Sequence, residues 1–148
     1  MTFASGKRAL SAVLMGAIAL SGSLALTACG GTTYAMVADA SLPFVQGKVS
    51  MSEAKDGNST YTVSVEHLGD PGKLSPQATV YVVWVLPAKE GATIQNMGVI
   101  KIDDSYSGSL SFKAAFRAFD ISVTPEPSGD VTTPTGRDVL KVNISLDK

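Results

Sequence analysis

The sequence predicts an all-β protein, an antiparallel sandwich of about seven strands, and three observations support this fold. Apolar residues alternate with polar ones through most of the chain after residue 44, which is typical of half-buried strands. Gly, Pro, Asn and Asp residues interrupt the alternation about every ten residues, as turns do. After residue 30, no long segment repeats its apolar residues at the 3.6-residue period of a helix.

The first two predicted strands form a hairpin. Residues 45–52 alternate, so that Val49 and Met51 share an apolar face. Residues 55–60 (KDGNST) are turn formers that tolerate positive φ. The alternation resumes at residues 61–68 (YTVSVEHL), and a loop rich in Gly and Pro follows.

The third predicted strand, at residues 80–86, is apolar on both faces. This pattern indicates a central strand that is covered on each side, with Trp84 as a core anchor. The last four predicted strands are residues 94–103, 109–116, 118–126 and 139–146. Residues 112–119 could instead form one helical turn. Seven short strands with regular turns indicate a sandwich or a barrel, and we favour an immunoglobulin-like sandwich.

The first thirty residues differ from the rest of the chain. Lys7 and Arg8 precede residues 9–26, which carry no charge and are mainly apolar. A short positive segment followed by an apolar stretch is the pattern of a secretory signal peptide. Several Ser and Gly residues make the stretch only weakly apolar for a permanent span, which needs about 20 predominantly apolar residues. We therefore predict a removable signal peptide at residues 1–28.

This segment ends in LTAC at residues 26–29, which resembles the lipobox of bacterial lipoproteins. The resemblance implies cleavage between Ala28 and Cys29 and attachment of acyl chains to Cys29. Two or more chains give stable anchoring, whereas one is marginal. The prediction is a protein on the cell membrane or outer membrane, with lipidated Cys29 and a short tether at residues 29–36 and a sandwich domain at residues 37–148.

Cys29 is the only cysteine, so a catalytic thiol is the alternative to lipidation. A reactive thiolate needs a histidine or a basic neighbour that lowers its pKa. The only histidine, His67, stands in a different part of the chain, without a thiol protease pattern around it. Lipidation is therefore the favoured role, and no cysteine is left over for a disulfide.

Several residues in the second half of the chain resemble the extracytoplasmic C-terminal domain of the anti-sigma-K factor family. They are Tyr81, Val83, Trp84, Gly98, Val123, Thr124, Glu126, Pro127, Gly129, Pro134, Thr135 and Gly136. The chain is also similar to small envelope lipoproteins with the same layout. The resemblance implies a shared β-sandwich, and a sensor or regulatory module as an alternative function.

Composition limits the remaining function classes. The chain has 12 basic and 13 acidic residues and no basic run, which argues against a nucleic-acid partner. It has no phosphate-binding loop, serine nucleophile elbow or run of metal ligands. We predict a non-catalytic binding or structural module of the cell envelope, with no cofactor and no metal. Its expected partners are the membrane, through Cys29, and another envelope protein.

Two small polar groups are weak candidates for chemistry. His67 could act as a general base or metal ligand with Glu66 and Asp70. Adjacent strand residues point to opposite faces, so a structural or surface histidine is favoured over a metal-binding or enzymatic site. The DDS segment at residues 103–105 lacks the carboxylate spacing of a calcium loop, which favours a solvated hairpin turn closed by aspartate side chains.

The loop at residues 124–138 (TPEPSGDVTTPTGRD) is the most distinctive segment. Three Pro and two Gly residues predict a long ordered excursion. Its candidate binding residues are Glu126, Asp130, Thr135 and Arg137, because loops on a rigid scaffold often carry binding. The alternative is a structural loop that steers the chain into the last strand, and we favour this structural role.

Overall fold

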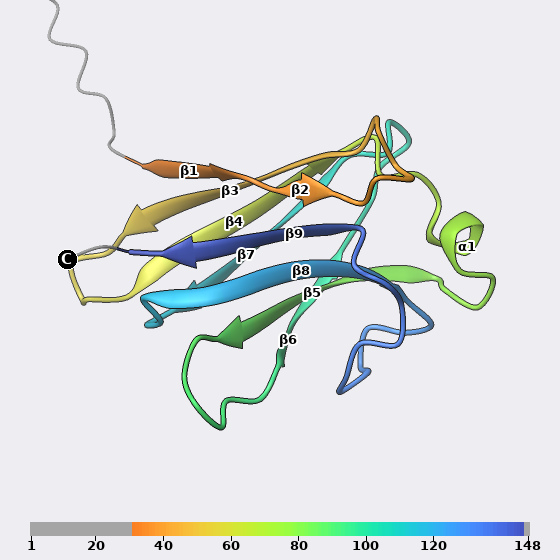
Figure 1. Cartoon of the computed structure of the whole chain (residues 1–148). Helices are drawn as coiled ribbons and strands as arrows, with labels where there is room; N and C mark the ends of the chain where they lie inside the picture. Colours follow the sequence, from red (N-terminus) through yellow and green to blue (C-terminus); the bar gives the residue numbers. More distant parts are fainter. Residues whose placement is uncertain (1–30, 147–148) are drawn as a thin grey trace, which may run out of the picture.

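The computed structural model describes residues 31–146 and shows two antiparallel sheets packed as a sandwich (Figure 1). Within this range, one sheet has the strand order β1-β3-β4-β7 and the other has the order β2-β9-β8-β5-β6. The elements are β1 (Thr32–Ala35), β2 (Val37–Ala38), β3 (Gln46–Glu53), β4 (Ser59–Glu66), α1 (Pro71–Leu74), β5 (Val80–Pro87), β6 (Gln95–Ile100), β7 (Gly108–Ala114), β8 (Ala118–Glu126) and β9 (Leu140–Ser145). The predicted all-β sandwich is confirmed.

The seven predicted strands correspond to β3 through β9, and their order is that of an immunoglobulin-like sandwich. The first, second and fifth of them form one sheet, and the third, fourth, sixth and seventh form the other. The predicted hairpin of β3 and β4 is present, with Val49 paired to Val63. Residues 101–107 carry the chain from one sheet to the other, so the turn predicted there is a crossover and not a hairpin.

The N-terminal strands begin earlier than the sequence pattern predicted. Residues 32–36 were expected in the tether, but Thr32–Ala35 form β1 and pair with β3. Met36 is buried, and β2 then pairs with β9 in the opposite sheet. The segment therefore closes one side of the sandwich by bonding to both sheets in turn. The period-two rule missed it because Thr32-Thr33-Tyr34-Ala35 shows no apolar alternation.

The core lies between the sheets, where the inward residues of each strand meet. Tyr61, Val63 and Val65 of β4 are buried, as their alternation predicted. Tyr61 packs edge-on against Phe119 of β8, with ring centroids 5.0 Å apart, and stacks on Phe112 of β7 at 5.7 Å. The contact with Phe119 joins the two sheets near the end of the sandwich where the chain enters β1, whereas the stack on Phe112 lies within one sheet.

The predicted signal peptide at residues 1–28 and the predicted lipidation residue Cys29 lie outside the described residues. Between residues 31 and 146, the structure has no helix of the length and apolar character that a membrane span requires.

Candidate functional site

The outer face of β5 carries a second buried layer. Val82 and Trp84 point away from the main core, yet both side chains are fully buried. The connection between β8 and β9, residues 127–139, folds back over this face. Asn96 of β6 holds it there, because its side-chain amide donates to the carbonyl oxygens of Gly129 at 3.0 Å and Val131 at 2.8 Å. The prediction that β5 is covered on both sides is therefore right, and a loop supplies the outer cover.

Glu126, at the end of β8, is a fully buried carboxylate at the base of this loop. Thr135 donates its backbone amide to both carboxylate oxygens, at 3.0 and 3.1 Å, and donates its hydroxyl as well. The backbone amide of Gly136 donates at 3.2 Å, and the hydroxyl of Thr124 also donates to Glu126. A buried charge is tolerated only with such a full set of donors.

The hydrogen-bond chain extends from Glu126 to Trp84. The indole Nε1 of Trp84 donates to the Thr124 hydroxyl at 2.8 Å, and that hydroxyl donates onward to Glu126. Burial raises the pKa of Glu126, but the hydrogen bonds from Thr124, Thr135 and Gly136 outweigh it and leave the pKa below the ordinary value of 4.5. The carboxylate is thus charged at neutral pH and fixes the loop to the sheet.

The four candidate binding residues of this loop have different positions. Glu126 and Thr135 are bonded to each other, so the Glu126 carboxylate is not available to a ligand. Asp130 accepts a hydrogen bond from the Ser128 hydroxyl at the surface. Arg137 extends to the loop before β3, where its guanidinium lies 3.9 Å from Asp39 and donates to Ser41 at 2.9 Å. These contacts favour the structural role that the sequence suggested for the loop.

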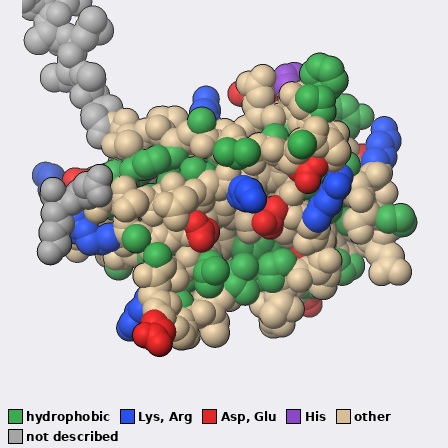
Figure 2. Space-filling model, viewed as in Figure 1, with side chains coloured by type: hydrophobic (Ala, Val, Ile, Leu, Met, Phe, Trp, Pro, Cys, Tyr) green, Lys and Arg blue, Asp and Glu red, His purple; other side chains and the backbone are tan. Residues whose placement is uncertain are grey.

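A shallow apolar groove lies beside the loop, on the outer face of the five-stranded sheet. It has a volume of about 520 Å³, and its apolar lining includes Val37, Leu86, Ile94 and Pro134. Asp120, Asp138 and Lys141 stand around it. Figure 2 shows hydrophobic side chains gathered on this face among scattered charged ones. The alternation of β5 does not predict the groove, because its walls come from six separate segments: residues 37, 86, 94, 120–122, 134–138 and 141–143.

His67 takes the surface position that was favoured, and an aspartate closes the turn at residues 103–105 as predicted, although this turn belongs to a crossover and not to a hairpin. His67 is exposed, follows the end of β4 and has a positive φ of 58°. Asp70 caps α1, and its carboxylate accepts from the Gly72 amide at 2.8 Å. Asp103 accepts from the amides of Ser105 and Ser107 at 2.9 and 3.0 Å, as an aspartate that closes a turn does.

Metal-ion ligands do not converge in the described range. Among residues 31–146, no three His, Cys, Asp or Glu side chains are grouped so that they could hold a metal ion.

The residues that carry the resemblance to the anti-sigma-K domain include those that hold the loop. Trp84, Thr124, Glu126, Thr135 and Gly136 all belong to the same buried hydrogen-bond network. No protein-family model matches the chain, and no curated protein matches it. The resemblance therefore stays a prediction, and these five residues have a structural role in this fold.

Proposed function

We propose that the protein is a lipid-anchored cell-envelope protein whose sandwich acts as a non-catalytic binding or structural module at the membrane surface. The observation that carries the proposal joins sequence and structure. β1 begins at Thr32, only three positions after Cys29. A lipid on Cys29 would therefore hold one end of the sandwich close to the head groups, since each residue spans at most about 3.3–3.6 Å.

The register of the strands defines which end this is. Thr32 pairs with Met51, near the turn between β3 and β4, and the chain then runs along the sandwich toward Ala38. Helix α1 and the loop after Glu126 lie at the opposite end (Figure 1). The eight residues of β3 span about 26 Å at 3.3 Å per residue. An anchored domain would therefore present this loop well above the membrane.

The groove on the five-stranded sheet is the surface that we assign to a protein partner. Two large hydrophobic side chains stand exposed at it, Val37 at 64% and Leu86 at 38%. Asp120, Asp138 and Lys141 form a mixed rim. Apolar centres with polar rims are typical of protein interfaces. The partner that fits is an apolar segment of another envelope protein, flanked by charges of both signs.

Acylation of Cys29 tests the anchor. Cells that produce the full-length protein are grown with radiolabelled palmitate, and the wild type is compared with Cys29→Ala. We expect label and membrane association in the wild type and loss of both in the variant. Ser23→Ala, within the same segment, is the control and should keep both. Equal labelling of the wild type and Cys29→Ala would refute the anchor.

The partner surface is tested by site-specific photo-crosslinking in intact cells. A crosslinker at Leu86 should give one adduct of defined size, identified by mass spectrometry, and Val37→Asp should abolish it. The matched control position is Ser109, exposed on β7 in the other sheet. The same adduct from both positions, or one that persists with Val37→Asp, would argue against the groove.

A further inference from the structure

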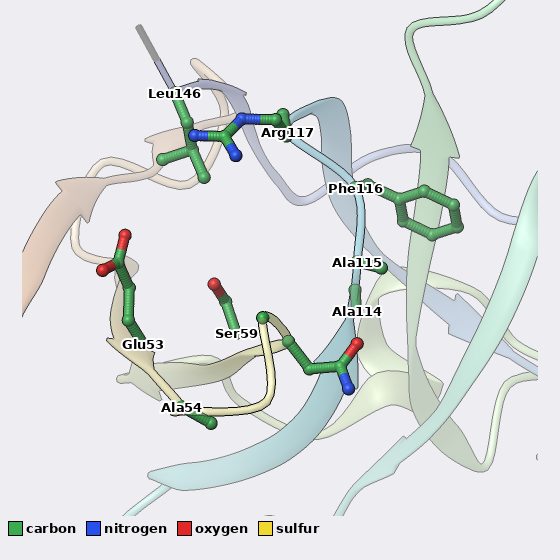
Figure 3. Close-up of a pocket in the computed structure, with 10 residues that line it drawn as sticks. Glu53, Ala54, Ser59, Ala114, Ala115, Phe116, Arg117 and Leu146 are labelled. Carbon is green, nitrogen blue, oxygen red and sulfur yellow. The ribbon is translucent and has the colours of Figure 1, made fainter. Parts of the chain in front are cut away.

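A polar cleft opens at the end of the sandwich where the chain enters β1. It lies between the tip of the β3–β4 hairpin and the connection from β7 to β8, and its volume is about 350 Å³ (Figure 3). Glu53 and Ser59 come from the hairpin, while Phe116 and Arg117 come from the connection. Leu146 closes the cleft beside Arg117, whose carbonyl oxygen accepts from the Leu146 amide at 2.8 Å.

The cleft carries one negative and one positive side chain on separate walls. Figure 3 shows Glu53 and Ser59 on the hairpin side of the cleft and Arg117 across from them. Glu53 and Arg117 do not form an ion pair with each other. The ion pair found within residues 31–146 joins Arg137 and Asp39. Both charged side chains line the same cleft as Ser59 and Phe116, and the Tyr61 hydroxyl donates to the carbonyl oxygen of Phe116 at 3.4 Å.

The cleft lies beside the point at which the anchor would enter. Thr32 pairs with Met51 of β3, and a Cβ at Gly31 would lie 3.0 Å from the Met51 carbonyl oxygen. Glu53 is two positions further along β3, on the side from which the chain arrives. A lipid at Cys29 would hold the cleft among the head groups of the membrane, and this step rests on the proposed function.

We propose that this cleft binds a phosphoethanolamine head group of a membrane lipid. A guanidinium is well suited to a phosphate, which it can bind through two parallel hydrogen bonds. The carboxylate of Glu53 would accept from the ammonium group, and the Ser59 hydroxyl could donate to a phosphate oxygen. Phosphatidylglycerol offers no ammonium to Glu53, and the quaternary ammonium of phosphatidylcholine has no N–H to donate. Glu53 and Arg117 together therefore favour phosphoethanolamine, whose head group carries both a phosphate and an ammonium group with N–H donors.

The chemistry is tested first with soluble phosphoethanolamine. The full-length protein in detergent is titrated while NMR follows the backbone amides of Ser59 and Phe116. We expect saturable shifts, and binding about two- to fivefold weaker for both Glu53→Gln and Arg117→Gln, as for exposed ion pairs. Glu90→Gln and Lys89→Gln, between β5 and β6, are matched controls outside the cleft and should bind like the wild type. If the shifts do not saturate, or if the cleft variants bind as tightly as the wild type, the cleft is not a phosphoethanolamine site.

The lipid source is tested with the anchored protein in nanodiscs. Hydrogen exchange of the Ser59 and Phe116 amides should be slower in phosphatidylethanolamine discs than in phosphatidylglycerol discs, and Arg117→Gln should remove the difference. Equal exchange in the two discs would overturn the lipid assignment, even where soluble phosphoethanolamine binds. Palmitate labelling of Cys29 separates the two proposals. A labelled protein without head-group binding refutes only the cleft, whereas an unlabelled protein that binds phosphoethanolamine refutes only the anchor.

Discussion

Thr135 donates both its backbone amide and its hydroxyl to the carboxylate of Glu126, nine positions earlier in the chain. These hydrogen bonds fix the base of the loop between β8 and β9, so that the loop stays folded over Trp84. The loop is long and rich in Pro and Gly, but its base is fixed by a buried charge. Its stability therefore depends on few residues, and each can be changed separately.

Glu126→Gln should lower the free energy of unfolding by about 2 kcal/mol. The amide has nearly the volume of the carboxylate, but it turns an N–H group toward donors and weakens charge-assisted hydrogen bonds. Urea denaturation measures the loss. Glu90→Gln at the surface is the control and should stay within about 0.5 kcal/mol of the wild type. Equal stability of both variants would show that the buried carboxylate is not needed.

The contribution of Glu126 to the free energy of unfolding should depend on pH. Its pKa in the folded protein is below the ordinary value of 4.5, so the folded state binds the proton more weakly than the unfolded chain does. The stabilisation is therefore complete at neutral pH and declines as the pH falls below about 4.5. The difference in unfolding free energy between the wild type and Glu126→Gln should shrink from about pH 6 to about pH 3. A constant difference would contradict the lowered pKa.

Thr124→Val should leave the indole N–H of Trp84 without an acceptor. An unpaired buried donor costs about 1–3 kcal/mol, and Glu126 loses one donor as well. Trp84 is the only tryptophan, so its fluorescence follows unfolding directly. Thr62→Val is the matched control, because the Thr62 hydroxyl bonds to Ser111 at the exposed surface. Similar losses from the two variants would mean that burial of the hydrogen bond does not matter.

Gly136→Ala should be more damaging than Gly57→Ala. A Cβ at Gly136 would lie 2.2 Å from the backbone oxygen of Pro125, so the loop would have to move. Gly57 has a positive φ of 82° and open space around it, so alanine there costs only about 1 kcal/mol of backbone strain. Thermal unfolding of the two variants compares these effects. The reverse order would show that the loop can shift away from Pro125 without loss.

His67→Gly should stabilise the protein by up to about 1 kcal/mol, because glycine adopts its left-handed backbone conformation without strain. His67→Ala keeps a Cβ and should bring no such gain, which makes it the matched control. Chemical denaturation gives both values. A large loss in His67→Gly alone would mean that flexibility of the unfolded glycine chain outweighs the relieved strain.

The strands could be predicted from the sequence where one face of the strand is buried and the other is exposed to solvent. Val49 and Met51 on β3 and Tyr61, Val63 and Val65 on β4 are buried as their period of two requires. β1 could not be predicted because it has no alternating apolar face. It is a strand because it forms hydrogen bonds with β3. Pairing partners far along the chain leave no local signal.

The candidate site was only partly visible in the sequence. The sequence predicts an ordered loop after Glu126, but it offers Glu126 itself as a candidate binding residue. Its burial depends on donors from Thr135 and Gly136, and composition cannot show that they reach back. The spacing of Thr124, Glu126 and the Thr135-Gly136 pair was the usable signal. The groove and the cleft could not be predicted, because each is assembled from segments that meet only in the fold.

The crossing of β1 and β2 from one sheet to the other has a mechanical consequence. β1 bonds to β3, and β2 bonds to β9, so the N-terminal segment is attached to both layers. A pull on the chain before Thr32 acts along the strands and loads these hydrogen bonds in shear, so that several must break together. Tension from a membrane would thus be shared between the two sheets. The whole domain would therefore resist such a pull. A terminal strand bonded to one sheet alone could instead separate from that sheet one hydrogen bond at a time.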